Sequence, residues 1–255
     1  MLILLPWLFI NSKLFIELLT YNPFVLIASV LCQVVYLCFL ALAYRNGEMS
    51  IVYPLSRSLP ILFAFGFEVL YKEIDFSRGY FIGILIQILG ILFICKNQGH
   101  RKFTISIVFS IITAIAICGY TIFDHHFLSA FSQHSTHSSI QVCLTYLLLL
   151  EAGIALCFSL PMVYSSKYRE SFRYLVKNEK FSGFKMAAGM TGAYGLVLLA
   201  MTFSSKASLV ISFRQLSIPL AFMIGIVFLK EVNNSFKWFG MVGICLGLIL
   251  VGISS

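Results

Sequence analysis

Three charged residues lie inside long apolar runs of the sequence, where side chains able to do chemistry are easiest to recognise. Arg57, Arg214 and Glu151 each stand among hydrophobic neighbours. A charged side chain at the centre of a membrane helix costs about 2.5–3.5 kcal/mol on insertion scales, so each should face a polar cavity or a partner. The arginines could attract an anionic group of a substrate, or they could form a structural pair or extend toward a nearer surface. Glu151 could bind an ammonium group, carry a proton or pair with an arginine.

Further candidates accompany these charges. Pro60 and Pro219 each remove a helical hydrogen bond and leave a backbone carbonyl without its donor, that of Gln215 in the second case. Such carbonyls are tolerated in a membrane where they line a cavity. Tyr120 and Asp124 are four residues apart, which places them on one helix face, where they could gate or cap a site. The candidate substrate-binding residues are therefore Arg57, Arg214, Glu151, Tyr120, Asp124 and Gln215.

The sequence offers no pattern typical of a metal site, a cofactor or an enzyme. His125, His126, His134 and His137 are predicted to share one loop, but they lack the spacing and the cysteine partners of a tetrahedral zinc site. The motifs of zinc proteases, serine hydrolases, phosphate-binding loops and dinucleotide-binding turns are also missing. We therefore predict no metal, no cofactor and no enzymatic activity.

The composition predicts that most of the protein surface is in contact with the lipid bilayer. The chain has 255 residues, of which 60% are hydrophobic and 11% charged, whereas soluble domains carry about 25% charged residues. The net charge of +8 is concentrated in short connections between apolar runs. Lysine and arginine in such positions set membrane topology, so nucleic-acid binding is not predicted.

The apolar runs predict an all-α polytopic bundle of about eight or nine transmembrane helices, because one crossing takes roughly 20 residues. This leaves no room for a separate soluble domain and indicates a multi-pass protein of the cell membrane, the inner or plasma membrane. The basic segment 165–185 is predicted as a loop that sets topology or lies on lipid headgroups. The predicted spans are 24–43, 50–71, 79–96, 103–124, 140–164, 186–204, 207–229 and 237–253, with a partial ninth at 1–17.

An internal repeat relates residues 43–94 to residues 200–251. Among its landmarks, Arg57 corresponds to Arg214, and Pro60 corresponds to Pro219. Two pairs of glycines also correspond, Gly83 with Gly240 and Gly90 with Gly247. Repeats of this kind are common in secondary transporters, whose substrate site lies at the repeat interface near the midplane. The predicted division is a first repeat at 1–96 and a second, five-helix repeat at 97–255 within one membrane domain.

These landmarks bring the chain close to a known family. Residues 52–60, with the Tyr71-Lys72-Glu73 sequence that follows, resemble the fourth helix of EamA-type transporters of the drug/metabolite transporter superfamily. Residues 212–217, with Lys230-Glu231, resemble the ninth helix, and residues 119–124 resemble the end of the sixth. The resemblance implies ten helices in two inverted five-helix repeats around a central cavity. It also implies that the last helices of the two repeats pack on each other.

The N-terminal part departs from that pattern, because residues 1–96 hold three spans and a fragment where the family has five helices. We expect the first helix of the family to be missing and its groove to be open to lipid. Orientation has two opposing indications. Connections on one side hold twelve Lys and Arg residues against four on the other, which places the C-terminus outside, whereas the resemblance implies a cytoplasmic C-terminus.

The function predicted from these features is secondary transport of a small polar metabolite, for example one similar to an amino acid. The small-molecule substrate and the bilayer are the predicted partners, and the sequence leaves the oligomeric state open. Two alternatives remain at this stage. One is a truncated membrane protein that transports nothing, and the other, less favoured, is an intramembrane enzyme, which would need a nucleophile and a base at membrane depth.

Overall fold

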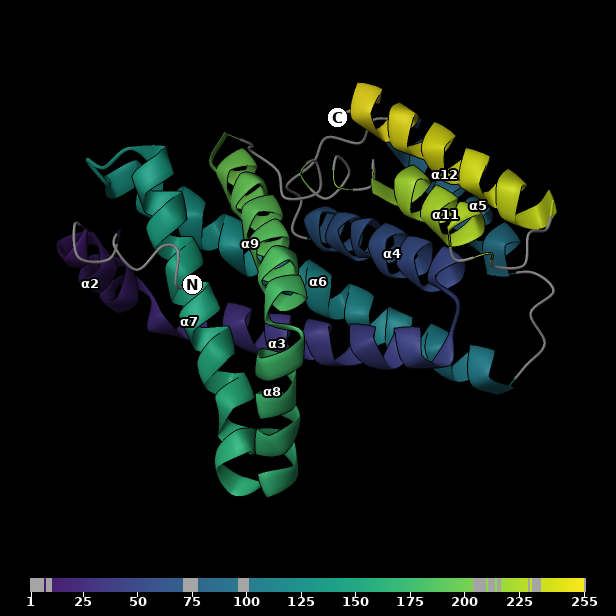
Figure 1. Ribbon diagram of the computed structural model, residues 1–255. Helices are drawn as coiled ribbons and strands as arrows, with labels where there is room; N and C mark the ends of the chain where they lie inside the picture. Colours follow the sequence, from purple (N-terminus) through teal and green to yellow (C-terminus); the bar gives the residue numbers. More distant parts are fainter. Residues whose placement is uncertain are drawn as a thin grey trace. The chain divides into compact units, whose positions relative to one another are not determined.

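The computed structural model describes residues 7, 11–70, 78–95, 101–203, 210, 214, 217–228, 230 and 235–254. Every regular element in these residues is an α-helix, as predicted (Figure 1). The helices are α2 (Ser12–Tyr21), α3 (Pro23–Asn46), α4 (Met49–Leu70), α5 (Arg78–Cys95), α6 (Arg101–His134), α7 (Ser139–Tyr164), α8 (Ser166–Asn178), α9 (Lys180–Phe203), α11 (Ser217–Val227) and α12 (Ser235–Ser254).

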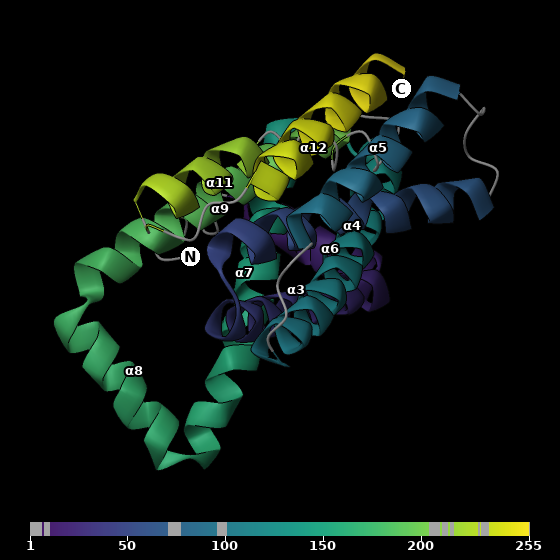
Figure 2. The ribbon, with the colours of Figure 1, turned by 90° about the vertical axis from the view of Figure 1, so that its right-hand side faces the viewer.

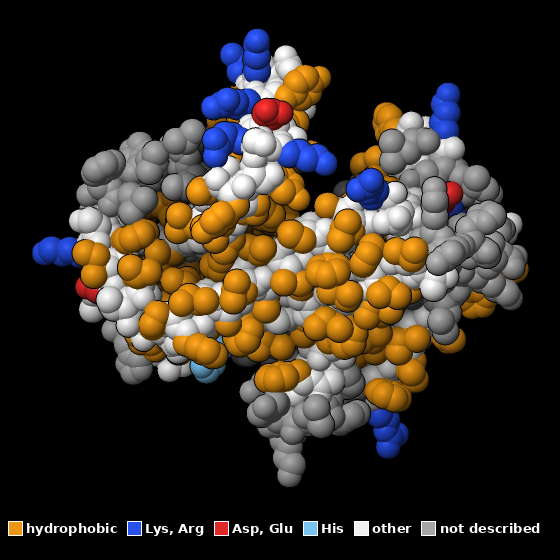
Figure 3. Space-filling view, turned by 90° about the horizontal axis from the view of Figure 1, so that it is seen from below, with side chains coloured by type: hydrophobic (Ala, Val, Ile, Leu, Met, Phe, Trp, Pro, Cys, Tyr) orange, Lys and Arg blue, Asp and Glu red, His pale blue; other side chains and the backbone are white. Residues whose placement is uncertain are grey.

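Among the described residues, five helices are long and apolar enough to cross a membrane: α3, α7, α9, α12 and the Thr104–Gln133 part of α6. Hydrophobic side chains extend over much of the face drawn in Figure 3. On α9, large side chains such as Phe184, Met190 and Leu196 are exposed, as expected of a helix whose surroundings are lipid rather than water. The predicted number of eight or nine spans and their inverted arrangement remain predictions.

Two connections predicted as loops are helical. The predicted span at 103–124 extends as α6 to His134, so that His125 and His126 lie within a helix. The basic segment 165–185 forms α8 and the first turns of α9. The predictions ended these helices where charges and histidines begin, because such residues are costly in a membrane. Asp124 lies inside α6 nevertheless, because other helices supply hydrogen-bond donors to its carboxylate.

The chain forms two compact units. The first consists of Met1–Val34 and Phe123–Ser205, and the second of Val35–Ile122 and Lys206–Ser255. This division follows contacts in space and does not test the repeat boundaries read from the sequence.

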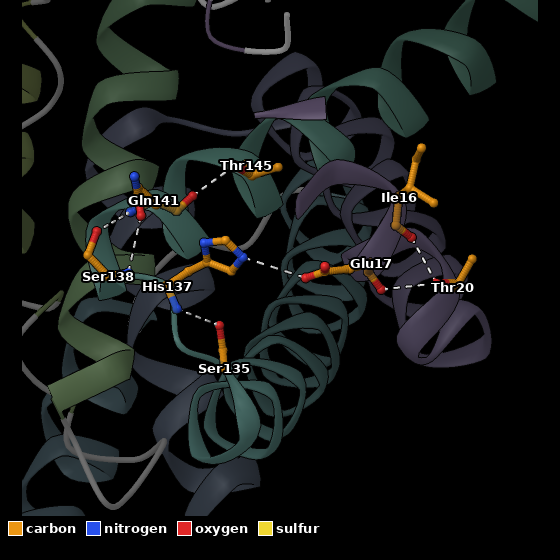
Figure 4. Close-up of polar contacts among 8 residues, drawn as sticks. All are labelled: Ile16, Glu17, Thr20, Ser135, His137, Ser138, Gln141 and Thr145. Carbon is orange, nitrogen blue, oxygen red and sulfur yellow. Dashed lines mark hydrogen bonds and ion pairs between the residues drawn. The ribbon is translucent and has the colours of Figure 1, made fainter. Parts of the chain in front are cut away.

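In the first unit, α2 packs against α7, and its residues Leu14 and Leu18 are buried. Figure 4 shows the polar contacts beside this packing. His137 Nε2 lies 3.6 Å from Glu17 Oε2. Ser138 and Gln141 form a capping box, in which the side chain of each accepts a hydrogen bond from the backbone N–H of the other. These contacts fix the beginning of α7, the helix that carries Glu151.

In the second unit, the helices pack in pairs. Helix α4 packs against α11, and α5 packs against α12. A core cluster of buried residues joins α4, α11 and α12, consisting of Ile51, Leu55, Ile218, Met241 and Ile244. Because α4 carries Arg57, this core holds the arginine's helix against the segment that follows Arg214.

Helices α5 and α12 approach each other backbone to backbone. A Cβ atom placed on Gly83 would lie 2.8 Å from the carbonyl oxygen of Gly247, and one on Gly90 would lie 2.6 Å from that of Gly240. Only glycine allows such an approach between helices. Helices α5 and α12, which the resemblance implies should pack on each other, are in contact.

The close approach predicts a large difference between two glycines of α12. Gly247→Ala should destabilise the protein by about 1–3 kcal/mol, because the added methyl group would meet the Gly83 carbonyl oxygen at 2.5 Å and Gln87 Cγ at 2.6 Å. Gly252→Ala is the matched control, since nothing lies within 4 Å of its added Cβ. Thermal unfolding in detergent should show a lower melting temperature for the first variant only. Equal melting temperatures would contradict the close packing.

Candidate functional site

Arg57 lies on α4 between two tyrosine rings. Its guanidinium carbon is 5.9 Å from the ring centre of Tyr36 and 5.5 Å from that of Tyr53. Its Nη2 also donates a long hydrogen bond of 3.4 Å to the Tyr36 hydroxyl. Cation–π contacts within about 6 Å stabilise a guanidinium without neutralising its charge. The positive charge of Arg57 is therefore supported and retained.

Arg214 has a parallel environment in the same unit. Its Nη2 donates a hydrogen bond of 2.9 Å to the hydroxyl of Tyr120, a buried residue of α6, and its guanidinium carbon is 5.8 Å from that ring centre. The backbone carbonyl of Arg214 accepts a hydrogen bond of 2.8 Å from Ser217 Oγ at the beginning of α11. Both its side chain and its backbone are thus held by neighbouring residues.

Two bridges connect the arginines. The rings of Tyr36 and Tyr120 meet edge to face at 5.8 Å between centroids. On the other side, the Tyr53 hydroxyl donates a hydrogen bond of 2.7 Å to Ser217. The contacts form a closed circuit from α3, α4, α6 and the segment around α11. We refer to its members as the arginine–tyrosine cluster: Arg57, Arg214, Tyr36, Tyr53, Tyr120 and Ser217.

The cluster carries two positive charges. Among the residues that the structure describes, neither arginine forms an ion pair with an acidic side chain. Nη1 of Arg214 is buried and has no hydrogen-bond partner among the described residues. A partly buried guanidinium group with an unpaired N–H is costly, whereas an anionic ligand would supply both the opposite charge and the missing acceptor.

Asp124 is the centre of a separate polar cluster in the first unit. Its carboxylate is fully buried and accepts hydrogen bonds from the hydroxyls of Ser29, Tyr146 and Tyr194, the one from Tyr146 at 2.7 Å. Gln33 Nε2 donates to both Ser29 Oγ and the Tyr194 hydroxyl at 3.3 Å. The cluster joins α3, α6, α7 and α9. Its hydroxyl groups satisfy a carboxylate that would otherwise be unfavourable in this apolar environment.

Of the two remaining candidates, Glu151 is not part of either cluster. Glu151 lies on α7, where Oε1 accepts a hydrogen bond of 2.9 Å from Thr191 Oγ1 of α9. Gln215 lies outside the described residues. The structure thus brings three of the predicted residues, Arg57, Arg214 and Tyr120, into one cluster. It gives Asp124 and Glu151 different partners.

Sequence reasoning did not identify the residues that support these groups. Tyr36, Tyr53 and Ser217 in one cluster, and Ser29 and Gln33 in the other, were not among the candidates. Gln33 could have been recognised from the sequence, because an amide inside the apolar run 24–43 needs hydrogen-bond partners at membrane depth. Nothing in the sequence distinguishes the tyrosines of the cluster, since the chain has 12 tyrosines and many lie in apolar runs.

The described residues contain no group of three or more histidine, cysteine, aspartate or glutamate side chains able to hold a metal ion. Neither a scan against protein-family models nor a search of curated proteins finds a match for this chain. A function for the chain is therefore inferred from its own residues.

Proposed function

We propose that the chain is a secondary transporter of the drug/metabolite type, which moves a small polar metabolite with an anionic group across the cell membrane. The observation that carries the proposal is the arginine–tyrosine cluster. It presents two guanidinium groups without acidic partners among the described residues, and one buried N–H group of Arg214 has no acceptor there. A carboxylate or phosphate matches this arrangement, because guanidinium groups bind such anions through paired hydrogen bonds.

The tyrosines add to the proposed role. They hold both guanidinium groups by ring faces and hydroxyls rather than by counter-charges. A substrate anion would therefore not have to displace a carboxylate before binding. Binding that is favourable yet reversible is what a transporter needs, because its substrate must leave on the other side.

The α5–α12 contact supports the inverted-repeat part of the proposal. Gly83 lies against Gly247, and Gly90 lies against Gly240. In the repeat, Gly83 corresponds to Gly240 and Gly90 to Gly247. Exchanging the two repeats therefore converts one contact into the other, as a two-fold axis requires. The numbering rises along α5 while it falls along α12, so the two helices run antiparallel, which is the relation expected of inverted copies.

The membrane setting for the proposal comes from the five helices of the described part of the chain that are long and apolar enough to span a bilayer. We further propose that the chain crosses the membrane several times, with α4, α5 and α11 completing the bundle. The sequence has no nucleotide-binding motif, and the proposed movement is accordingly driven by a gradient.

Uptake by vesicles that contain the purified chain tests the proposal. Radiolabelled anionic, zwitterionic, cationic and neutral metabolites would be offered under an imposed proton or sodium gradient, with protein-free vesicles as the control. We expect time-dependent accumulation of at least one anionic or zwitterionic compound and inhibition of its uptake by unlabelled anions of the same class.

Two results would contradict the proposal. Movement of cations alone would exclude the arginine–tyrosine cluster as the substrate site. A folded protein that moves no compound of the panel under either gradient would favour the transport-inactive alternative. Circular dichroism of the reconstituted protein distinguishes this second result from loss of structure.

A further inference from the structure

Helix α8 differs from the other helices in its surroundings and its pattern. It lies between α7 and α9 in the first unit (Figure 2). It buries none of its side chains. Tyr168, Phe172, Leu175 and Val176 are each about half exposed or more. Their spacing of three and four residues places them on one helix face, so α8 presents an apolar stripe that no described helix covers.

A basic stripe runs beside this apolar one. Arg169, Arg173 and Lys177 follow one another at intervals of four residues and therefore line one side of α8. Figure 3 shows lysine and arginine side chains gathered beside hydrophobic ones near the top of the view, where α8 lies. Within the part of the chain that the structure describes, Arg173 and Lys177 form no hydrogen bond or ion pair with another side chain.

Arg169 has a different role, which fixes α8 in place. Its Nε donates a hydrogen bond of 3.3 Å to the carbonyl of Met162, and its Nη2 donates one of 3.2 Å to that of Val163. These carbonyls belong to the last turn of α7, where a helix has no internal donors left. The arginine thus ties α8 to the end of a helix that is long and apolar enough to cross the membrane.

We propose that α8 is a binding site for anionic phospholipid, with its apolar stripe in the headgroup region and Arg173 and Lys177 on the lipid phosphates. A helix with aromatic and aliphatic residues on one side and basic residues on the other is the type that lies in a membrane interface. Anchoring to α7 holds α8 near the membrane surface. The inference is independent of the transport function proposed above.

The charge pattern selects the kind of lipid. Segment 165–185 holds six of the twelve Lys and Arg residues on the more basic side of the predicted topology. The positive-inside rule, one of the two opposing indications of orientation, places that side in the cytoplasm, and we adopt that orientation. The cytoplasmic leaflet is the one that carries anionic lipids, and each nearby basic side chain strengthens its attraction by roughly fivefold in affinity. Zwitterionic lipids have no net charge and would not be attracted in this way to Arg173 and Lys177.

Quenching by brominated lipid measures this preference directly. A Tyr168→Trp probe would be placed in the full chain with Trp7→Phe and Trp238→Phe, and Leu175→Trp would serve as a second, parallel probe. Each protein would be reconstituted with brominated phosphatidylglycerol or brominated phosphatidylcholine at equal mole fraction. We expect at least about tenfold preferential quenching by phosphatidylglycerol, which decreases as salt is added.

Matched charge variants assign the preference to the residues. Arg173→Gln with Lys177→Gln should remove most of it, whereas Lys13→Gln with Arg45→Gln, which removes two exposed charges on other helices, should leave it unchanged. Equal quenching by the two lipids, or a preference that survives the first pair of substitutions, would overturn the anionic-lipid site. Absence of quenching by either lipid at both probes would show that α8 does not lie at the bilayer.

Discussion

Arg57→Gln and Arg214→Gln are each expected to lower the initial rate of anion uptake by about 30-fold or more while the protein remains folded. Loss of one charged hydrogen-bond partner from a desolvated ligand anion costs about 2–5 kcal/mol, which sets this magnitude. Folding should be little affected, because neither arginine forms an ion pair among the described residues. The rate would be measured in vesicles well below the substrate concentration that saturates uptake.

Two further variants interpret the result. Arg57→Lys should retain part of the activity, because lysine keeps the charge but cannot form a paired hydrogen bond with a carboxylate or phosphate. Arg45→Gln, which removes an exposed charge at the end of α3, should transport like the parent. If the two glutamine variants instead unfold, the arginines hold the bundle together. If they fold and transport normally, the site lies elsewhere.

Glu48→Gln should lower stability by about 2–3 kcal/mol, the largest effect we expect from a single charge. Lys237 of α12 is only 2% exposed, and its Nζ lies 2.7 Å from Glu48 Oε2. Removing one partner of a buried ion pair leaves an uncompensated charge and typically costs about 3–5 kcal/mol. We expect less here because the Glu48 side chain is 36% exposed and water partly screens it.

A double-mutant cycle tests this interpretation. Glu48→Gln combined with Lys237→Met should recover most of the lost stability, because both charges are then gone. Glu170→Gln, on the exposed surface of α8, serves as the control for removal of one negative charge. Chemical unfolding in detergent would give the four free energies of the cycle. Simple additivity of the two single substitutions would show that the ion pair contributes nothing.

The sequence predicts which segments are helical better than it predicts where the helices end. The apolar runs at 24–43 and 140–164 correspond closely to α3 and α7. The end of α6 was placed ten residues too early, since Asp124 is tolerated there only through hydroxyl groups of other helices. Three basic residues of α8 recur at every fourth position, a spacing that indicates a helix. The high charge of α8 favoured a loop, because the prediction considered only helices that cross the membrane.

The charged residues of the candidate site could be predicted from the sequence, but the residues that contact them could not. Arg57 and Arg214 are conspicuous because a charge in an apolar run must have a reason. Tyr36 and Tyr53 look like ordinary residues of an apolar helix, and only their contacts with Arg57 distinguish them. Lys237 illustrates the opposite case, since it is one of the twelve Lys and Arg residues that were assigned to the connections on the more basic side of the membrane. It is in fact buried against Glu48.

The glycine contact between α5 and α12 has a mechanical consequence for the second unit. Packed helices usually slide past one another by small changes of side-chain rotamer, but glycine has no rotamers to change. Gly83 and Gly247 place backbone directly on backbone, and any sliding would bring peptide groups into collision. We therefore expect α5 and α12 to move together as one rigid body. Any opening within the unit would then bend α4, where two prolines interrupt the hydrogen bonding and open space surrounds Gly66.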